Sequence, residues 1–292
     1  MDEELIEAYD NFVIGNFTQC LDMSSRARPS SDFSQFMWES LVARCNLGLG
    51  LMDKIRELSK SGTSNPALQG TAYFAVFQRS QVETQRKTAF ERVIDNANHS
   101  NGEPVSCYYS CVARALSGDL IDAISYAKAV AASSPSEFNA LRAQFSLAIN
   151  RPDLADNILA ESAASRDDSA ATKLVASMHA LVTGKSNEAC MCYSDLIAQF
   201  SAEGSLALAN GRAVGNIQRG QLSEAEEDLE HTASVKPDNV DTIRNMICCL
   251  TWQGRRDEAR EWLGKLASGS PNHKLVSDCG KLRDVFSNFA TA

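Results

Sequence analysis

Apolar side chains recur along the chain at helical spacing rather than alternating with polar ones. No segment has the strict period of two that a half-buried strand requires, so no sheet is predicted. The clearest helical face belongs to a segment over 272–289, which would place on one side Leu275, Cys279, Leu282, Val285, Phe286 and Phe289. The pattern therefore predicts an all-α protein whose last helix covers the end of the fold as a cap.

Sixteen further helices are predicted, in eight pairs joined by short breaks. Apolar periodicity, helix-stop residues and prolines set their ends. Their ranges are 2–14 and 17–28, 33–48 and 52–60, 66–80 and 83–97, 104–117 and 120–132, 136–149 and 152–164, 168–183 and 186–200, 203–219 and 222–234, and 238–253 and 256–268.

A glycine or asparagine marks the break inside most of these pairs. The marker recurs at intervals of 32 to 36 residues, at Gly118, Asn150, Gly184, Gly220 and Gly254, and an alanine follows five residues after each one. Glycine and asparagine end a helix in the left-handed conformation, and alanine lets the second helix pack closely against the first. The intervals therefore predict a repeated helical hairpin of about 34 residues.

Two more positions recur with the same period. A small residue precedes most markers by seven positions, and a proline follows at Pro135, Pro237 and Pro271. Together with the turn glycine, these residues resemble the tetratricopeptide repeat. The resemblance implies an α-solenoid of about eight hairpins in a right-handed superhelix. We expect one domain over 1–292, with 272–289 as its capping helix, and the least regular packing at 66–97, which lacks the marker.

Charge and hydropathy disfavour two classes of partner, nucleic acid and the membrane interior. The chain has 28 Lys and Arg against 37 Asp and Glu, a net charge of −9, which is unsuited to binding nucleic acid. No apolar run approaches the roughly 20 residues that span a bilayer. The start of the chain is acidic where a secretory signal would be basic. We therefore expect a cytosolic protein without direct membrane insertion.

Cysteine and histidine spacing gives no sign of catalysis or metal binding. Among the nine cysteines, the neighbours Cys190 and Cys192, or Cys248 and Cys249, do not have the spacing of a structural zinc site. We interpret the cysteines as reduced, buried core residues. The chain also lacks the usual nucleophile, phosphate-loop and zinc-protease motifs. We expect no catalytic residue, metal or cofactor and no enzyme, with a hydrolase within 66–97 as the remaining alternative.

Both ends of the chain resemble a known family. The stretch from Tyr9 to Cys20, the segment from Leu208 to Ala213 and the run from Pro237 to Ile247 are similar to the epsilon-subunit family of coatomer, a cytosolic vesicle coat. The resemblance implies a non-catalytic subunit that curls around the C-terminal region of the alpha subunit and, through it, is linked to the beta-prime subunit. It also implies Golgi-to-ER and intra-Golgi transport, and a cytoplasmic location, peripheral on Golgi membrane and coated vesicles.

A solenoid of this type binds its partner on the inner wall. In the repeat register, first-helix positions two, three, six, ten and thirteen before the marker face inward. We expect partner contacts from nine of these residues, namely Tyr9, Phe12, Tyr108, Val112, Gln144, Met178, Val182, Asn210 and Val214. An apolar, aromatic wall with scattered amides suits a peptide or helix. The alternative is a co-chaperone adaptor that binds C-terminal peptides. It would need several converging cations, but inward ones are few, such as Arg44 and Arg244.

Overall fold

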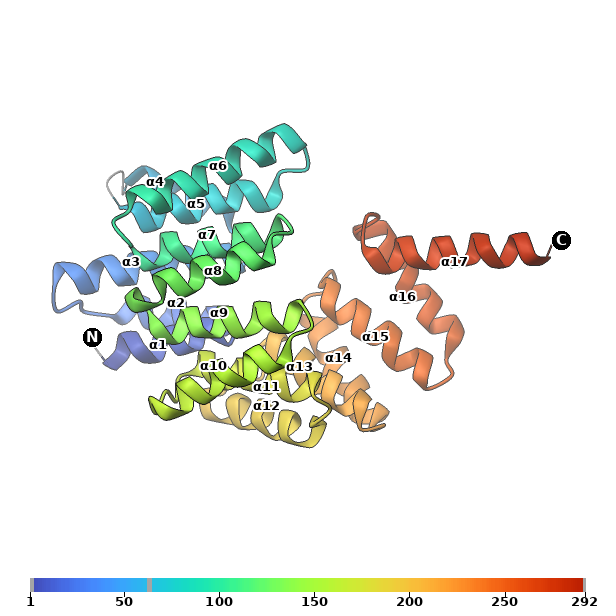
Figure 1. Ribbon diagram of the computed structural model, residues 1–292. Helices are drawn as coiled ribbons and strands as arrows, with labels where there is room; N and C mark the ends of the chain where they lie inside the picture. The colour runs from blue at the N-terminus through green and yellow to red at the C-terminus, as the bar shows by residue number, and fades with distance from the viewer. Residues whose placement is uncertain (1–2, 62–64, 291–292) are drawn as a thin grey trace. The chain divides into compact units, whose positions relative to one another are not determined.

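The computed structural model describes the backbone of residues 3–61 and 65–290 and the side chains of 3–57 and 65–287. Within these ranges the chain forms seventeen α-helices and one short 3-10 turn, with no strand (Figure 1). The helices are α1 (Glu3–Val13), α2 (Phe17–Arg26), α3 (Asp32–Gly48), α4 (Met52–Ser61), α5 (Pro66–Arg79), α6 (Glu83–His99), α7 (Pro104–Leu116), α8 (Leu120–Val130), α9 (Pro135–Ala148), α10 (Pro152–Ala164), α11 (Ala170–Val182), α12 (Ser186–Phe200), α13 (Leu206–Gln218), α14 (Leu222–Val235), α15 (Val240–Trp252), α16 (Arg256–Gly269) and α17 (Lys274–Ala290).

The predicted all-α class is confirmed, and the predicted helix ends agree with the structure within three residues. The largest difference is the start of α13, predicted at 203 and found at Leu206. Ser205 is the reason, because its side chain accepts a hydrogen bond from the Leu208 amide and so caps the helix at that point.

The recurring glycines and alanines do what their spacing predicts. The turn markers have positive φ angles, which are 97° at Gly118, 57° at Asn150 and 75° at Gly220. The alanine five residues after a marker is fully buried at Ala123 and Ala225. The left-handed residue reverses the chain, and the missing side-chain bulk lets the two helices of a pair approach.

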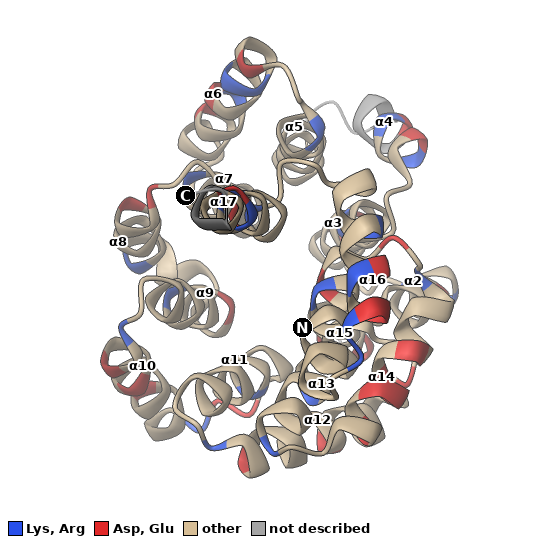
Figure 2. Ribbon diagram, turned by 90° about the vertical axis from the view of Figure 1, so that its right-hand side faces the viewer, with Lys and Arg blue, Asp and Glu red and all other residues tan. Residues whose placement is uncertain are grey.

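Contacts between residues divide the chain into two compact units, Met1–Thr183 and Gly184–Ala292. We call them the N-terminal and C-terminal units and describe each by itself. In the N-terminal unit the odd-numbered helices α3 to α11 form an inner layer, and the even-numbered helices α2 to α10 lie outside them (Figure 2). The single domain expected over 1–292 stays a prediction.

The first and last helices of the N-terminal unit touch each other. The Asp10 carboxylate, on α1, accepts a hydrogen bond of 3.2 Å from the backbone amide of Ala170, the first residue of α11. An acceptor at a helix N-terminus satisfies an amide that has no partner within the helix. The contact brings the inner helices of this unit around a common space.

The expectation of irregular packing at 66–97 was wrong. Helices α5 and α6 pack as an ordinary pair, with Phe77 and Phe90 ring centroids 5.9 Å apart and Val93 buried between them. Ser80 and Val82 in the connection have extended backbone, with ψ of 117° and 121°. Because this turn needs no left-handed residue, the sequence carries no glycine marker there.

Helix α17 exists as predicted, but part of its apolar face is exposed, and its role as a capping helix stays a prediction. Within the C-terminal unit it extends away from α16, with the C-terminus at its far end (Figure 1). The side chains of Leu282 and Phe286 are 58% and 71% exposed. An apolar stripe predicts a helix whether or not a neighbouring surface is present, so the pattern could not reveal that this face is open.

Candidate partner-binding groove

The inner helices of the N-terminal unit enclose a cavity of about 460 Å³. All its lining residues except Phe17 come from the odd-numbered helices α1 to α11. Its walls are mostly aromatic and aliphatic side chains, and Gln78 and Gln144 supply amides. This volume falls within the range of cavities that hold small molecules or inserted side chains.

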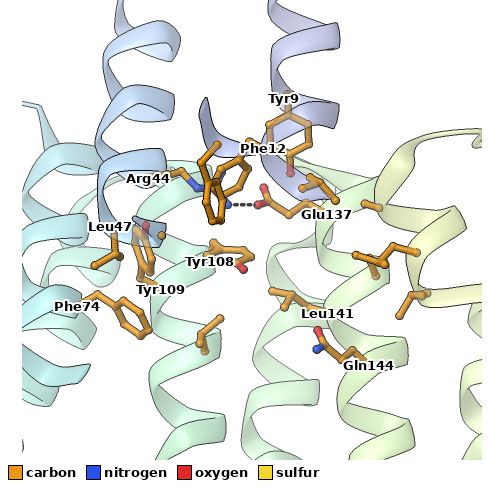
Figure 3. A pocket seen from close by; sticks show the side chains of 18 of the residues that line it. Tyr9, Phe12, Arg44, Leu47, Phe74, Tyr108, Tyr109, Glu137, Leu141 and Gln144 are labelled. Carbon is orange, nitrogen blue, oxygen red and sulfur yellow. Dashed lines mark hydrogen bonds and ion pairs between the residues drawn. The ribbon is translucent and has the colours of Figure 1, made fainter. Parts of the chain in front are cut away.

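A buried ion pair crosses this cavity from α3 to α9. The Arg44 guanidinium donates a hydrogen bond from Nη2 to Oε1 of Glu137, 93 residues away in the sequence (Figure 3). The two side chains are only 3% and 8% exposed. Glu137 lies in the first turn of α9, where a carboxylate is favoured by the helix dipole.

Aromatic rings surround the guanidinium. Its central carbon lies 4.4 Å from the centroid of the Phe12 ring and 4.6 Å from that of Tyr108. The stacked rings of Phe74 and Tyr109, with centroids 4.6 Å apart, continue the wall (Figure 3). A cation held over aromatic faces and away from water gains both electrostatic attraction and packing.

Burial and the local charges fix the protonation states of Arg44, Tyr9 and Tyr108. Burial alone would lower the pKa of Arg44, but the Glu137 carboxylate raises it well above its usual value, so the guanidinium stays charged. Burial, followed by the charge of Glu137, raises the pKa of Tyr9 well above its usual value. Burial also raises the pKa of Tyr108. Both hydroxyls are therefore protonated at neutral pH.

The structure brings together six of the nine residues expected to face a partner. These six line the cavity and are Tyr9, Phe12, Tyr108, Val112, Gln144 and Met178. Val182, at the end of α11, is not part of the lining and is 52% exposed. In the C-terminal unit, Val214 is half-buried. Asn210 is buried there, and its side chain bonds to Thr242 and Asn245.

Sequence reasoning placed Arg44 on the inner wall but missed Glu137 and several other residues that shape the cavity. Arg44 precedes Gly50, the corresponding glycine of the second helix pair, by six residues, and Glu137 precedes Asn150 by thirteen, which are both inward positions. The closeness of the two side chains depends on how α3 and α9 curve around the groove. Phe74 lies in the pair without a marker, so no register was available for it.

The cysteines and the third helix pair give no sign of a catalytic or metal site. Cys248 is exposed and Cys192 and Cys279 are half-buried, so the expectation that all nine cysteines are buried was wrong for these three. Among the described residues, no group of three His, Cys, Asp or Glu could hold a metal ion.

A second cavity, of about 320 Å³, lies along α5 and α6, where a hydrolase was the alternative. Its described lining has the hydroxyls of Thr84 and Thr88 and the cation of Arg92, without a carboxylate, imidazole or thiol. Within the described part of the chain, no helix has the length and apolar content needed to cross a membrane.

A family profile described as "Coatomer epsilon subunit" matches residues 1–292. The chain belongs to the coatomer epsilon subunit family. The "Coatomer subunit epsilon-2" of Oryza sativa subsp. indica is 26% identical over 152 residues, which is 51% of this chain and 50% of that protein. The chain thus matches about half the length of this curated relative.

Solved structures share the fold of this chain. A chain of the APC/C hetero-tetramer Cut9-Hcn1 superposes with a TM-score of 0.66 and 13% identity, over 91% of this chain and 52% of that one. A tetratricopeptide repeat protein from Parabacteroides merdae gives a TM-score of 0.59 at 13% identity, over 86% and 98%. These similarities confirm the predicted repeat fold.

Proposed function

We propose that this member of the coatomer epsilon subunit family binds the C-terminal region of the coatomer alpha subunit in the groove of its N-terminal unit. Through the alpha subunit it would be linked to the beta-prime subunit. In this role it supports Golgi-to-ER and intra-Golgi transport from the cytoplasm, peripheral on Golgi membrane and coated vesicles. The observation that carries the proposal is the convergence of six predicted partner-facing residues on one cavity.

The walls of the cavity suit a polypeptide partner. Aromatic rings such as Tyr108 and Phe74 offer large contact areas with little side-chain entropy to lose, and tyrosines are enriched among the residues that dominate binding energies. Gln78 and Gln144 can donate to and accept from a peptide backbone. These features support the binding of an apolar, extended segment.

The co-chaperone alternative receives no support from the cavity. A carboxylate-binding adaptor needs free cations that converge on one point. Among the described lining residues Arg44 is the single cation, and Glu137 already neutralises it. A C-terminal carboxylate placed here would face the Glu137 charge.

Thermal unfolding with a purified fragment that spans the C-terminal region of the alpha subunit tests the proposal. A ligand that binds only the folded state raises its stability, so a saturating fragment is expected to raise the midpoint by several degrees. A fragment of equal length and similar charge from another part of the alpha subunit serves as the control. An unchanged midpoint at a saturating concentration of the C-terminal fragment would contradict the proposal.

A further inference from the structure

The inner cavity of the N-terminal unit has no net charge to offer a ligand. Arg44 and Glu137 are the charged side chains among its described lining residues, and they are paired with each other. An incoming anion would be repelled by the Glu137 carboxylate and an incoming cation by the Arg44 guanidinium. Burial strengthens both effects because little water is present to screen the charges. The cavity therefore selects against charged groups.

The same place holds a hydrogen-bond donor that has no acceptor. The Arg44 Nε is buried and has no hydrogen-bond partner among the described residues. A buried donor without a partner has lost its water and gained nothing in return. A bound group that brings an oxygen acceptor would correct this imbalance, whereas a plain hydrocarbon would leave it in place.

The walls add a requirement for apolar bulk. Phe12, Phe74 and Tyr108 present ring surface, and Leu141 and Met178 present aliphatic surface. Figure 3 shows the labelled side chains of α1, α3, α5, α7 and α9 converging on one space. A single aromatic or branched aliphatic side chain from another chain would bury its surface against these walls.

We propose that this cavity is an anchor subsite, which takes one bulky, uncharged side chain of a bound polypeptide while a main-chain carbonyl of that polypeptide accepts a hydrogen bond from Arg44 Nε. A residue of a polypeptide combines an apolar side chain with the neutral oxygen acceptor of its peptide group. The inference deepens the proposed function and rests on it, because it states what the gripped segment must contain.

A neutral probe and its charged relatives test the subsite directly. N-acetyl-tryptophan amide carries a ring and two peptide groups without charge, N-acetyl-tryptophan adds a carboxylate, and tryptophan amide adds an ammonium. Each is titrated into the full chain, and binding is followed by NMR of the Val112 and Met178 methyl groups, which line the cavity. We expect the neutral probe to bind at least about tenfold more tightly than either charged one.

Two variants fill the cavity from α9. Ala140→Trp places an indole at a half-buried lining position, and Gln144→Trp does so from an exposed lining position that tolerates a large side chain in the fold. Ile121→Trp is the matched control, because Ile121 lies on the outer helix α8 and is 72% exposed. Both filling variants should lose the neutral probe, and the control should bind it as the unmodified chain does.

Affinities for the alpha-subunit fragment, measured by calorimetry on the same chains, separate the two proposals. A loss of about tenfold or more in both filling variants, but not in Ile121→Trp, supports both. If the fragment does not bind the unmodified chain while the neutral probe behaves as expected, the proposed function fails and the subsite stands. Unchanged fragment affinity in both filling variants overturns the subsite, and so does equal binding of a charged probe.

Discussion

Replacing Glu137 by leucine is expected to lower the free energy of unfolding of the N-terminal unit by about 3–5 kcal/mol. The Arg44 side chain is 3% exposed, and its charge would be uncompensated because no other carboxylate lines the described cavity. An uncompensated charge away from water is far more costly than a missing surface ion pair. Trp38, buried on α3, reports this unit by fluorescence in a chain whose Trp252 and Trp262 are replaced by phenylalanine.

The double variant Arg44→Met with Glu137→Leu is the control for this prediction. It removes both charges and keeps similar side-chain volume, so most of the lost stability should return. The difference between the double variant and the sum of the single variants measures how strongly the two groups interact. A loss below about 1 kcal/mol in Glu137→Leu, typical of an exposed pair, would mean that water reaches the guanidinium.

Adding one methyl group at Gly211 is the second large effect that the structure predicts. A Cβ at this position would overlap the Cζ atom of the Tyr193 ring and lie 2.5 Å from its Cε1 atom, well inside van der Waals contact. Tyr193 is 2% exposed, so the ring has no room to withdraw. Such overpacking costs about 1–3 kcal/mol.

Gly264→Ala on α16 provides the matched comparison for Gly211→Ala. Both glycines lie inside helices, so alanine gains about 1 kcal/mol of helix propensity at either position. A Cβ at Gly264 meets no atom within 4 Å. Gly264→Ala should therefore be more stable than the unmodified chain, and Gly211→Ala about 1–3 kcal/mol less stable than Gly264→Ala in urea unfolding. Equal stability of the two variants would contradict the close approach of Tyr193.

The segment around Gly211 resembles the family closely, and the structure gives a physical reason for its residues. Its residues hold the C-terminal unit together, because Ala213 is fully buried and Asn210 bonds to the next repeat at Thr242. Arg212 forms a two-point ion pair with Asp228, with contacts of 3.0 and 2.5 Å. The features that reveal the family in this segment therefore serve the architecture.

Much of the fold could be predicted because single positions of the repeat require particular residue types. A left-handed turn needs a residue such as Gly118 or Asn150, and a close helix crossing needs a small one such as Ala123. The chain turns through extended residues at Ser80 and Val82, so the glycine or asparagine marker is missing there. The prediction of irregular packing failed there for this reason.

Several residues of the candidate site could be predicted from the sequence, but the contacts between distant helices that form the cavity could not. The register places Tyr9, Tyr108 and Gln144 on the inner wall, and the structure finds all three lining one cavity. The pairing of Arg44 with Glu137 depends on curvature summed over several helix pairs, which no local pattern encodes. The open face of α17 was missed for a similar reason, since a helix pattern does not reveal what lies beside it.

Hydrogen exchange measured by mass spectrometry, with and without the C-terminal fragment of the alpha subunit, tests the central claim most directly. Binding in the inner groove should slow exchange in α1, α3, α7, α9 and α11, which line the cavity, because a ligand specific to the folded state suppresses local opening. The outer helices α4 and α6 should change little. Protection confined to outer helices, or no change in the cavity-lining helices at a saturating fragment concentration, would contradict the account.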